Sequence, residues 1–134
     1  MAAKWQKTLD ELLYNGDLDG AYNLLDGIIR DNPNDIKARV AFGRVQYELG
    51  DPDNARNTFE TVLKRDPNNG DALKGRAEVC ELLGDYEVAI RSYHMATQSM
   101  PKDLEAWKSM GILLTKLKQF SKADKCWNAI LRLN

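Results

Sequence analysis

Apolar residues recur at the spacing of an α-helix along most of the chain, in segments separated by short polar breaks. One kind of break contains a proline, and the prolines at Pro33, Pro67 and Pro101 are each 34 residues apart. An alanine follows each of these prolines five residues later. A fixed interval of this kind predicts an internal repeat of helical units.

Other positions keep the same period of 34 residues. A small residue recurs at Ala21, Ala55, Ala89 and Ala123. A large apolar residue stands four positions after each alanine, at Leu25, Phe59, Tyr93 and Trp127. A further column, small in all units but the first, contains Leu9, Gly43, Ala77 and Gly111. Because large side chains beside small ones let two helices approach and fill the space between them, these columns predict helix–helix packing within each unit.

A glycine followed by an aspartate marks a tight turn inside each of the first three units. The pairs are Gly16–Asp17, Gly50–Asp51 and Gly84–Asp85. Glycine ends a helix at low cost in the left-handed conformation, and aspartate caps the next helix by accepting from its free N–H groups. After Pro67, Asn68 and Asn69 are placed to cap the following helix. Each unit is therefore predicted to be helix, tight turn, helix, then a proline-marked joint.

The period divides the chain into four units: residues 2–35, 36–69, 70–103 and 104–134. The pattern resembles the tetratricopeptide repeat (TPR) family, whose unit is a 34-residue helix–turn–helix. The first large column of that family is matched by Trp5, Leu73 and Trp107. The resemblance covers almost the whole chain, as a single TPR domain over residues 1–134. It implies an all-α fold, a right-handed α-solenoid (superhelix) of antiparallel helix hairpins with about eight helices and a concave face.

Some positions depart from the family pattern. Arg39 stands where a large apolar residue is usual, so its aliphatic stem must pack while its charge reaches solvent. Lys118 and Gln119 replace the Gly-Asp pair in the fourth unit. Since a lysine in a left-handed turn costs about 1 kcal/mol, that turn is expected to differ in shape. Gln46 and Cys80 sit where the family prefers tyrosine.

In the TPR family the first helix of each unit lines the concave face, which implies that a partner binds there. The candidate groove residues lie off the packed columns at a spacing of three to four. They are Gln6, Asp10, Leu13, Val40, Arg44, Tyr47, Lys74, Glu78, Glu81, Lys108, Ile112 and Thr115. Arg44, Tyr47, Lys74 and Lys108 are the leading candidates for peptide contacts, because arginine and aromatic side chains contribute strongly to interfaces. The alternative is a solvated face of mixed charge.

One activity of the family is excluded by residue type. TPR domains that hold the C-terminal carboxylates of heat-shock chaperones use a clamp of lysine, asparagine and arginine. The matching columns carry Gln6, Asp10, Ala41, Asp71 and Gly75 or, shifted by one repeat, Val40, Arg44, Gly75, Glu105 and Ser109. Neither set supplies the cations, and Asp71 or Glu105 would repel a carboxylate. A chaperone-tail clamp is therefore not expected.

Candidate chemistry is sparse. His94 is the only histidine, and its place next to the core residue Tyr93 predicts an exposed side chain. No HExxH, phosphate-loop or GxSxG motif and no ligand cluster occurs, so no enzyme activity, cofactor or metal site is expected. Cys80 and Cys126 form no CxxC pair and are interpreted as reduced thiols that pack as small apolar residues.

Composition and charge exclude further classes. The 134 residues carry a formal net charge of −1, so bulk charge predicts no attraction to nucleic acid or to an anionic membrane. RNA binding in the manner of pentatricopeptide repeats is not expected, because those repeats have a longer period and a basic groove. No apolar run is long enough for membrane insertion, and the first residues do not form a secretory signal. These observations favour a cytoplasmic location.

The two ends differ in charge. Residues 1–35 contain three Lys or Arg and seven Asp or Glu, a net charge of −4. Residues 102–134 contain seven Lys or Arg and three Asp or Glu, a net charge of +4. This asymmetry favours head-to-tail self-association, or an acidic partner near the C-terminal end.

The last unit stops one residue before the next proline of the repeat would fall, at position 135. No polar capping helix follows it, although terminal repeats usually need one. Trp127, Ile130 and Leu131 are therefore expected to form an exposed end-stacking surface. This expectation fits a fragment of a longer repeat protein, or a module that stacks through its ends.

The function expected from these features is a non-enzymatic protein–protein interaction scaffold. Its partner peptide or helix would bind in the concave groove of the superhelix. Two alternatives stay open at this point. One is a structural module that self-associates through its terminal repeats, and the other is the regulatory TPR arm of a longer multidomain protein.

Overall fold

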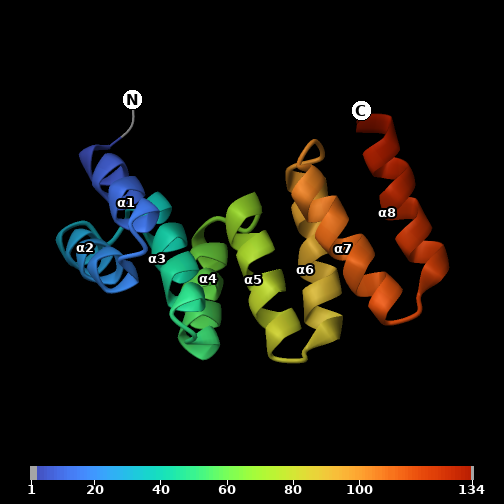
Figure 1. Cartoon of the computed structure of the whole chain (residues 1–134), viewed down its shortest axis with the longest axis horizontal. Helices are drawn as coiled ribbons and strands as arrows, with labels where there is room; N and C mark the ends of the chain where they lie inside the picture. The colour runs from blue at the N-terminus through green and yellow to red at the C-terminus, as the bar shows by residue number, and fades with distance from the viewer. Residues whose placement is uncertain (1–2, 134) are drawn as a thin grey trace.

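The computed structural model describes residues 3–133, which form eight helices and no strand. The helices are α1 (Lys4–Tyr14), α2 (Leu18–Asp31), α3 (Ile36–Glu48), α4 (Pro52–Arg65), α5 (Gly70–Leu82), α6 (Tyr86–Ser99), α7 (Leu104–Lys116) and α8 (Phe120–Leu133). They pair in chain order as four hairpins that follow one another along the long axis (Figure 1). The all-α solenoid expected from the repeat is confirmed. The outer unit limits, residues 2 and 134, lie outside the described residues.

Each joint between hairpins is a two-residue turn whose first residue is a proline. The missing N–H of proline costs no helical hydrogen bond at this place. The residue two positions later caps the next helix with a side-chain oxygen. These caps are Asp35, Asn69 and Asp103, which accept from backbone N–H groups at 3.0, 3.0 and 3.2 Å. Of the two asparagines expected to cap α5, only Asn69 does so, because Asn68 lies one residue too early, in the turn.

The tight turns inside the first three hairpins have the expected geometry. Their glycines adopt φ values of 71°, 81° and 82°, in the left-handed region. Asp17 and Asp51 cap the helices that follow, at 2.8 and 3.5 Å. The expected cap at Asp85 is wrong, because its side chain accepts no hydrogen bond from α6. The side chain of Asp85 is exposed, so water can hydrate the carboxylate instead.

The fourth tight turn keeps the shape of the other three, so the expectation of a different shape is wrong. Lys118 has a φ of 62°, and the Gln119 N–H donates to the Leu114 carbonyl at 2.8 Å. The equivalent bond in the third turn runs from the Asp85 N–H to the Cys80 carbonyl, also at 2.8 Å. Because the Lys118 side chain is exposed, it meets no steric obstacle, and the packing of α7 on α8 holds the strained backbone.

We expect Lys118→Gly to raise the free energy of unfolding by up to about 1 kcal/mol, because glycine has no Cβ penalty at positive φ. Part of the gain is lost to the larger entropy of glycine in the unfolded chain. Urea unfolding measures the effect. Lys118→Ala is the control, since it removes the charge but keeps the Cβ. Equal stability of the glycine and alanine variants would show that the turn stores no strain.

Phe59 is the central side chain of the middle core. Its exposed fraction is 0%, and its ring lies against Gly43 of α3 and Gly75 of α5. A Cβ added at these glycines would lie 2.8 and 2.4 Å from ring atoms. In the last hairpin Gly111 faces Trp127 in the same way, at 2.9 Å. The pairing of small and large columns expected from the repeat is confirmed, and Gly75 is a further contact that the columns did not predict.

Departures from the repeat pattern are accommodated without unpaired buried groups. The Nε–H of Arg39 donates to the Pro33 carbonyl at 2.9 Å, which holds its charged end at the joint. Gln46 is buried and hydrogen-bonded to a threonine of α4. Cys80 and Cys126 are free and buried, as expected, and burial raises the pKa of both thiols. No buried side-chain N or O atom in the described part of the chain lacks a hydrogen-bond partner.

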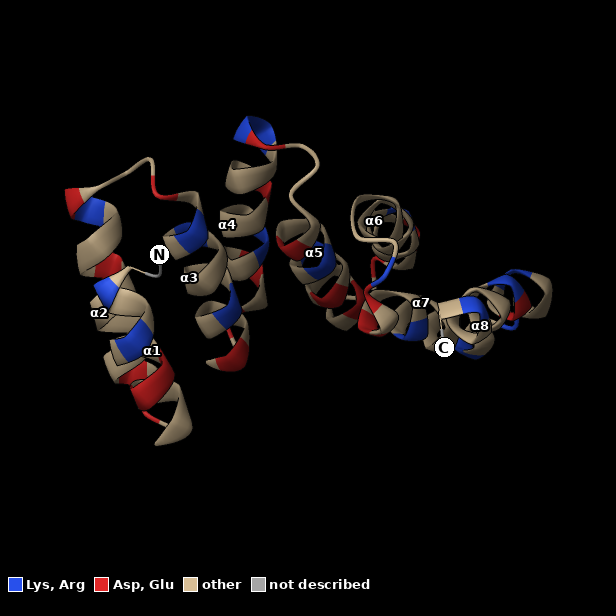
Figure 2. Ribbon diagram, turned by 90° about the horizontal axis from the view of Figure 1, so that it is seen from above, with Lys and Arg blue, Asp and Glu red and all other residues tan. Residues whose placement is uncertain are grey.

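The acidic and basic units lie at opposite ends of the solenoid. The hairpin α1–α2 forms one end of the long axis and α8 the other (Figure 1). Figure 2 shows the Lys and Arg segments of α8 in blue at the end of the solenoid that carries the C-terminus. A single molecule therefore cannot bring its acidic first unit and its basic last unit together.

Candidate protein-binding groove

A cleft of about 810 Å³ crosses the first helices of the first three hairpins, α1, α3 and α5. Five of the residues expected in the groove line it: Gln6, Asp10, Val40, Arg44 and Lys74. They meet here because the 34-residue repeat places equivalent positions of successive units on the same face of neighbouring helices. We call this cleft the groove.

A smaller hollow of about 310 Å³ lies at the other end of α3 and α5. It contains three more of the expected residues, Tyr47, Glu78 and Glu81. Tyr86 and Lys116 also line it, and the ammonium of Lys116 lies 5.9 Å from the centre of the Tyr86 ring.

Four expected groove residues line neither hollow. They are Leu13, Lys108, Ile112 and Thr115, all of them exposed. Helix α7 reaches the two hollows only through residues at its ends, Glu105 and Lys116. The groove therefore does not extend along the middle of the fourth hairpin.

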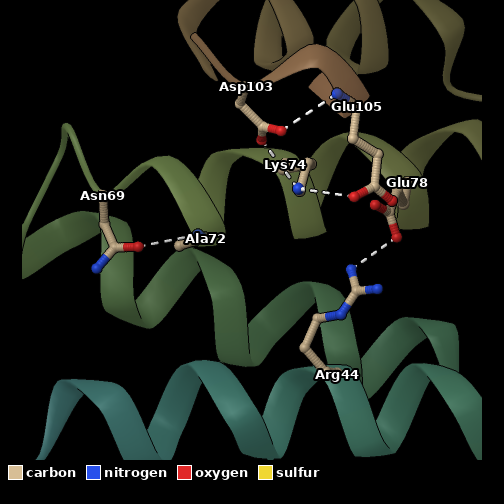
Figure 3. Close-up of polar contacts among 7 residues, drawn as sticks. All are labelled: Arg44, Asn69, Ala72, Lys74, Glu78, Asp103 and Glu105. Carbon is tan, nitrogen blue, oxygen red and sulfur yellow. Dashed lines mark hydrogen bonds and ion pairs between the residues drawn. The ribbon is translucent and has the colours of Figure 1, made fainter. Parts of the chain in front are cut away.

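An ion pair between neighbouring helices fixes one cation of the groove. The guanidinium of Arg44 on α3 donates to the Glu78 carboxylate on α5 at 2.6 Å (Figure 3). The two residues are 34 positions apart and thus occupy the same column in consecutive units. That spacing is a signal from which the pair could have been predicted. The Glu78 side chain is only 17% exposed, so water screens this pair less than a surface pair.

A second cation is held between two carboxylates. The ammonium of Lys74 lies 3.0 Å from the Asp103 carboxylate and 3.5 Å from that of Glu105 (Figure 3). Partial burial acts to lower the pKa of Lys74, but the hydrogen bonds and charges of the two acids outweigh it and raise that pKa above its usual value. Asp103 also caps α7, so the same side chain connects the joint to the groove. Sequence reasoning missed this role because the joint was treated only as a turn.

Tyr93 of α6 has a role beyond filling the core. It is 2% exposed, and its hydroxyl donates to the Glu81 carboxylate at 2.9 Å. Burial, together with the negative charge of Glu81, strongly raises the pKa of the Tyr93 phenol. The phenol therefore stays neutral and holds Glu81 at the smaller hollow as a fixed acceptor. The repeat pattern identified Tyr93 only by its size.

Further residues of the groove were not among those expected. Lys7 and Lys37 contribute exposed cations, and Trp5, Leu9 and Ala41 contribute apolar surface. These residues lie between the candidate positions. A spacing of three to four selects one narrow row of residues on each helix, and the cleft is wider than that row. The resulting surface combines both charge signs with apolar area.

The expected end-stacking residues lie on α8. Leu131 is 68% exposed, whereas the equivalent residues Leu63 and Thr97 are 9% and 1% exposed. Trp127 and Ile130 are half-buried. Columns covered in the earlier units are thus partly open in the last one.

Other chemistry is limited in the described residues. No group of three His, Cys, Asp or Glu side chains between residues 3 and 133 is arranged to hold a metal ion. His94 is exposed on α6, as expected. Of the eight described helices, none has the length and apolar composition needed to cross a membrane.

Solved structures show the same fold. The crystal structure of MamA superposes with a TM-score of 0.82 at 17% identity, covering 94% of this chain and 74% of that one. MamA residues 41 to the end, from Desulfovibrio magneticus RS-1, superpose with a TM-score of 0.83 at 17% identity. The superposition covers 95% of this chain and 72% of that one. A tetratricopeptide repeat protein from Parabacteroides merdae superposes with a TM-score of 0.81 at 24% identity. The superposition covers 96% of this chain and 51% of that protein. None of the curated proteins matches the sequence.

A family model supports the same assignment from sequence. The model for the tetratricopeptide repeat matches residues 12–80, which is more than half of the chain. Proteins of this family generally serve as protein–protein interaction scaffolds, a role that does not itself require catalysis. The repeat pattern, the four helix hairpins and this match together show that the chain belongs to the tetratricopeptide repeat family.

Proposed function

We propose that the groove over α1, α3 and α5 binds an extended or helical segment of a partner protein. The observation that carries the proposal is the cleft of about 810 Å³. A volume in this range suits a ligand site, and the cleft is formed by side chains of three separate hairpins. Because the walls belong to three units, the site depends on the correct stacking of the solenoid.

Fixed side chains support this proposal. Arg44 is paired with Glu78 of α5, and Lys74 is paired with Asp103 at the joint before α7. Side chains that are ordered before binding lose less entropy when a partner arrives. Two cations of the groove are therefore held in place before a partner arrives.

The residues of the groove indicate the chemistry of the partner segment. Lys7, Lys37, Asp10 and Asp71 provide charges of both signs, and Trp5 provides apolar area. A segment of mixed charge with an apolar anchor fits this surface. A free C-terminal carboxylate fits poorly, because the carboxylates of Asp71 and Glu105 line the cleft and Lys74 is already engaged. This arrangement supports the exclusion of a chaperone-tail clamp.

A displayed peptide library selected against the chain provides a probe for the groove. We expect the double variant Asp10→Lys/Lys37→Glu to weaken binding of the selected peptides at least about tenfold, or roughly 1.4 kcal/mol. This variant exchanges two exposed charges in the groove and keeps the net charge. The matched control, Glu60→Lys/Lys64→Glu, makes the same exchange at exposed positions of α4 outside the groove. Titration by fluorescence anisotropy measures each affinity.

The same titration separates the groove from the end-stacking surface. Leu131→Lys places a charge on that surface and leaves the groove intact. Peptide binding that survives the groove exchange and is lost in Leu131→Lys would rule out the groove and place the peptide site on the end-stacking surface.

A further inference from the structure

A second large cleft lies between α6 and α8, with α7 as its floor, and its volume is about 800 Å³. The apolar floor contains Trp107, Met110 and Leu114 of α7, and Ile90 of α6 adds to the wall. These α7 residues lie on a different face of the helix from the expected groove residue Ile112. The α6–α8 cleft is therefore separate from the groove.

The side chains between successive hairpins differ along the solenoid. Between the first two hairpins the rings of Tyr22 and Phe42 pack with centroids 4.8 Å apart. The equivalent pair between the second and third hairpins is Arg56 and Arg76, and Arg76 donates to Ser92 of its own hairpin at 2.9 Å. Between the third and fourth hairpins the equivalents are Ile90 and Met110, and these shorter apolar side chains line the open cleft.

The rim of the α6–α8 cleft is positively charged. Four exposed cations surround the apolar floor: Arg91, Lys122, Lys125 and Arg132. Glu87 is the single carboxylate in the lining, and no ion pair within residues 3–133 involves these cations. An apolar floor with a cationic rim suits an apolar side chain flanked by carboxylates.

The opposite end of the molecule presents a group of this kind. Tyr14, the last residue of α1, is 92% exposed, and Leu13 beside it is 42% exposed. Three exposed acids that do not line the groove surround them in sequence: Glu11, Asp17 and Asp19. Together they form a small exposed apolar patch with an acidic rim, which is complementary to the apolar floor and cationic rim of the cleft.

We propose that the α6–α8 cleft binds Tyr14 and Leu13 of a second copy of this chain, with the acids of that copy facing the cationic rim. The cleft is lined by α6, α7 and α8, whereas Tyr14 is the last residue of α1, and α1 and α8 lie at opposite ends of the solenoid (Figure 1). The contact is therefore heterologous, and each molecule keeps one unused end for a further copy. Self-association through these ends is independent of peptide binding in the groove.

Sedimentation equilibrium across a concentration series tests this contact. We expect the average mass to rise above the monomer mass of 15.2 kDa in low salt and to fall back toward it in about 0.5 M salt. Tyr14→Ala and Lys122→Glu/Lys125→Glu should each weaken association at least about tenfold. All three positions are exposed, so the variants are expected to fold normally. The control Lys64→Glu/Lys102→Glu changes the net charge by the same amount at two exposed positions outside the cleft. It should associate like the wild type.

Mixing the two defective variants distinguishes a head-to-tail contact from other modes. Tyr14→Ala retains an intact cleft, and Lys122→Glu/Lys125→Glu retains an intact Tyr14 corner. Each variant alone should stay monomeric, and an equimolar mixture should form a heterodimer that does not grow further. A mixture that stays monomeric, or variants that still associate like the wild type, would overturn the contact. A wild type that is monomeric at every concentration in low salt would also overturn it, and would leave the cleft to a segment of another protein.

Discussion

We expect Phe59→Ala to lower the free energy of unfolding by about 3–5 kcal/mol. The ring has no exposed surface and lies between α3 and α5, so its removal leaves a cavity that both helices line. Gly43 and Gly75 carry no side chains that could refill the space. Because the groove crosses the same two helices, loss of this ring should also weaken the site.

Urea unfolding followed by circular dichroism measures the effect of Phe59→Ala. Phe120→Ala is the matched control, because it makes the same truncation at a side chain that is 58% exposed. We expect that control to lose less than about 1 kcal/mol. Similar losses in the two variants would show that Phe59 is not the centre of the core.

Gly75→Ala is expected to destabilise the fold by about 1–3 kcal/mol, although alanine favours a helix more than glycine does. The added Cβ would lie 2.4 Å from the Phe59 ring. The ring cannot move away, because Gly43 contacts it from α3. The steric cost therefore exceeds the helix-propensity gain of about 1 kcal/mol.

A glycine at which an added Cβ would meet no other atom provides the control for Gly75→Ala. Gly27 lies inside α2, and a Cβ there would meet no atom within 4 Å. Gly27→Ala should stabilise the chain by up to about 1 kcal/mol, measured by the same unfolding method. In the Phe59→Leu background, Gly75→Ala should cost less than in the wild type, because the smaller side chain makes room. Stabilisation by Gly75→Ala alone would contradict the tight approach.

The fold could be predicted from the sequence because the packing columns repeat. Equivalent positions make the same kind of contact in different units. The contact of Gly43 with Phe59 recurs as the contact of Gly111 with Trp127. The joints were predictable for the same reason, since proline and the cap two residues later recur with the period. Lys118 shows the limit of this reasoning. The residue type indicated an altered turn, but tertiary packing imposed the conformation of the unit.

The candidate sites depend on details that the columns do not contain. Whether Lys74 projects freely or pairs with Asp103 is decided by the path of the joint, not by periodicity. The α6–α8 cleft depends on side chains that differ between units, such as Met110 in place of Arg76 and Phe42. Positions that vary between units therefore determine the candidate surfaces, and the residues of one repeat do not predict the surface of the next.

We propose that the groove over α1, α3 and α5 is the surface that binds the partner segment. Amide chemical-shift mapping of the 15N-labelled chain, titrated with a peptide from the library selection, tests it most directly. We expect the largest shifts on the groove residues of these helices, around Asp10, Val40 and Lys74, and small shifts on α2 and α4. Shifts confined to α4, to the α6–α8 cleft or to the end-stacking surface would contradict the claim.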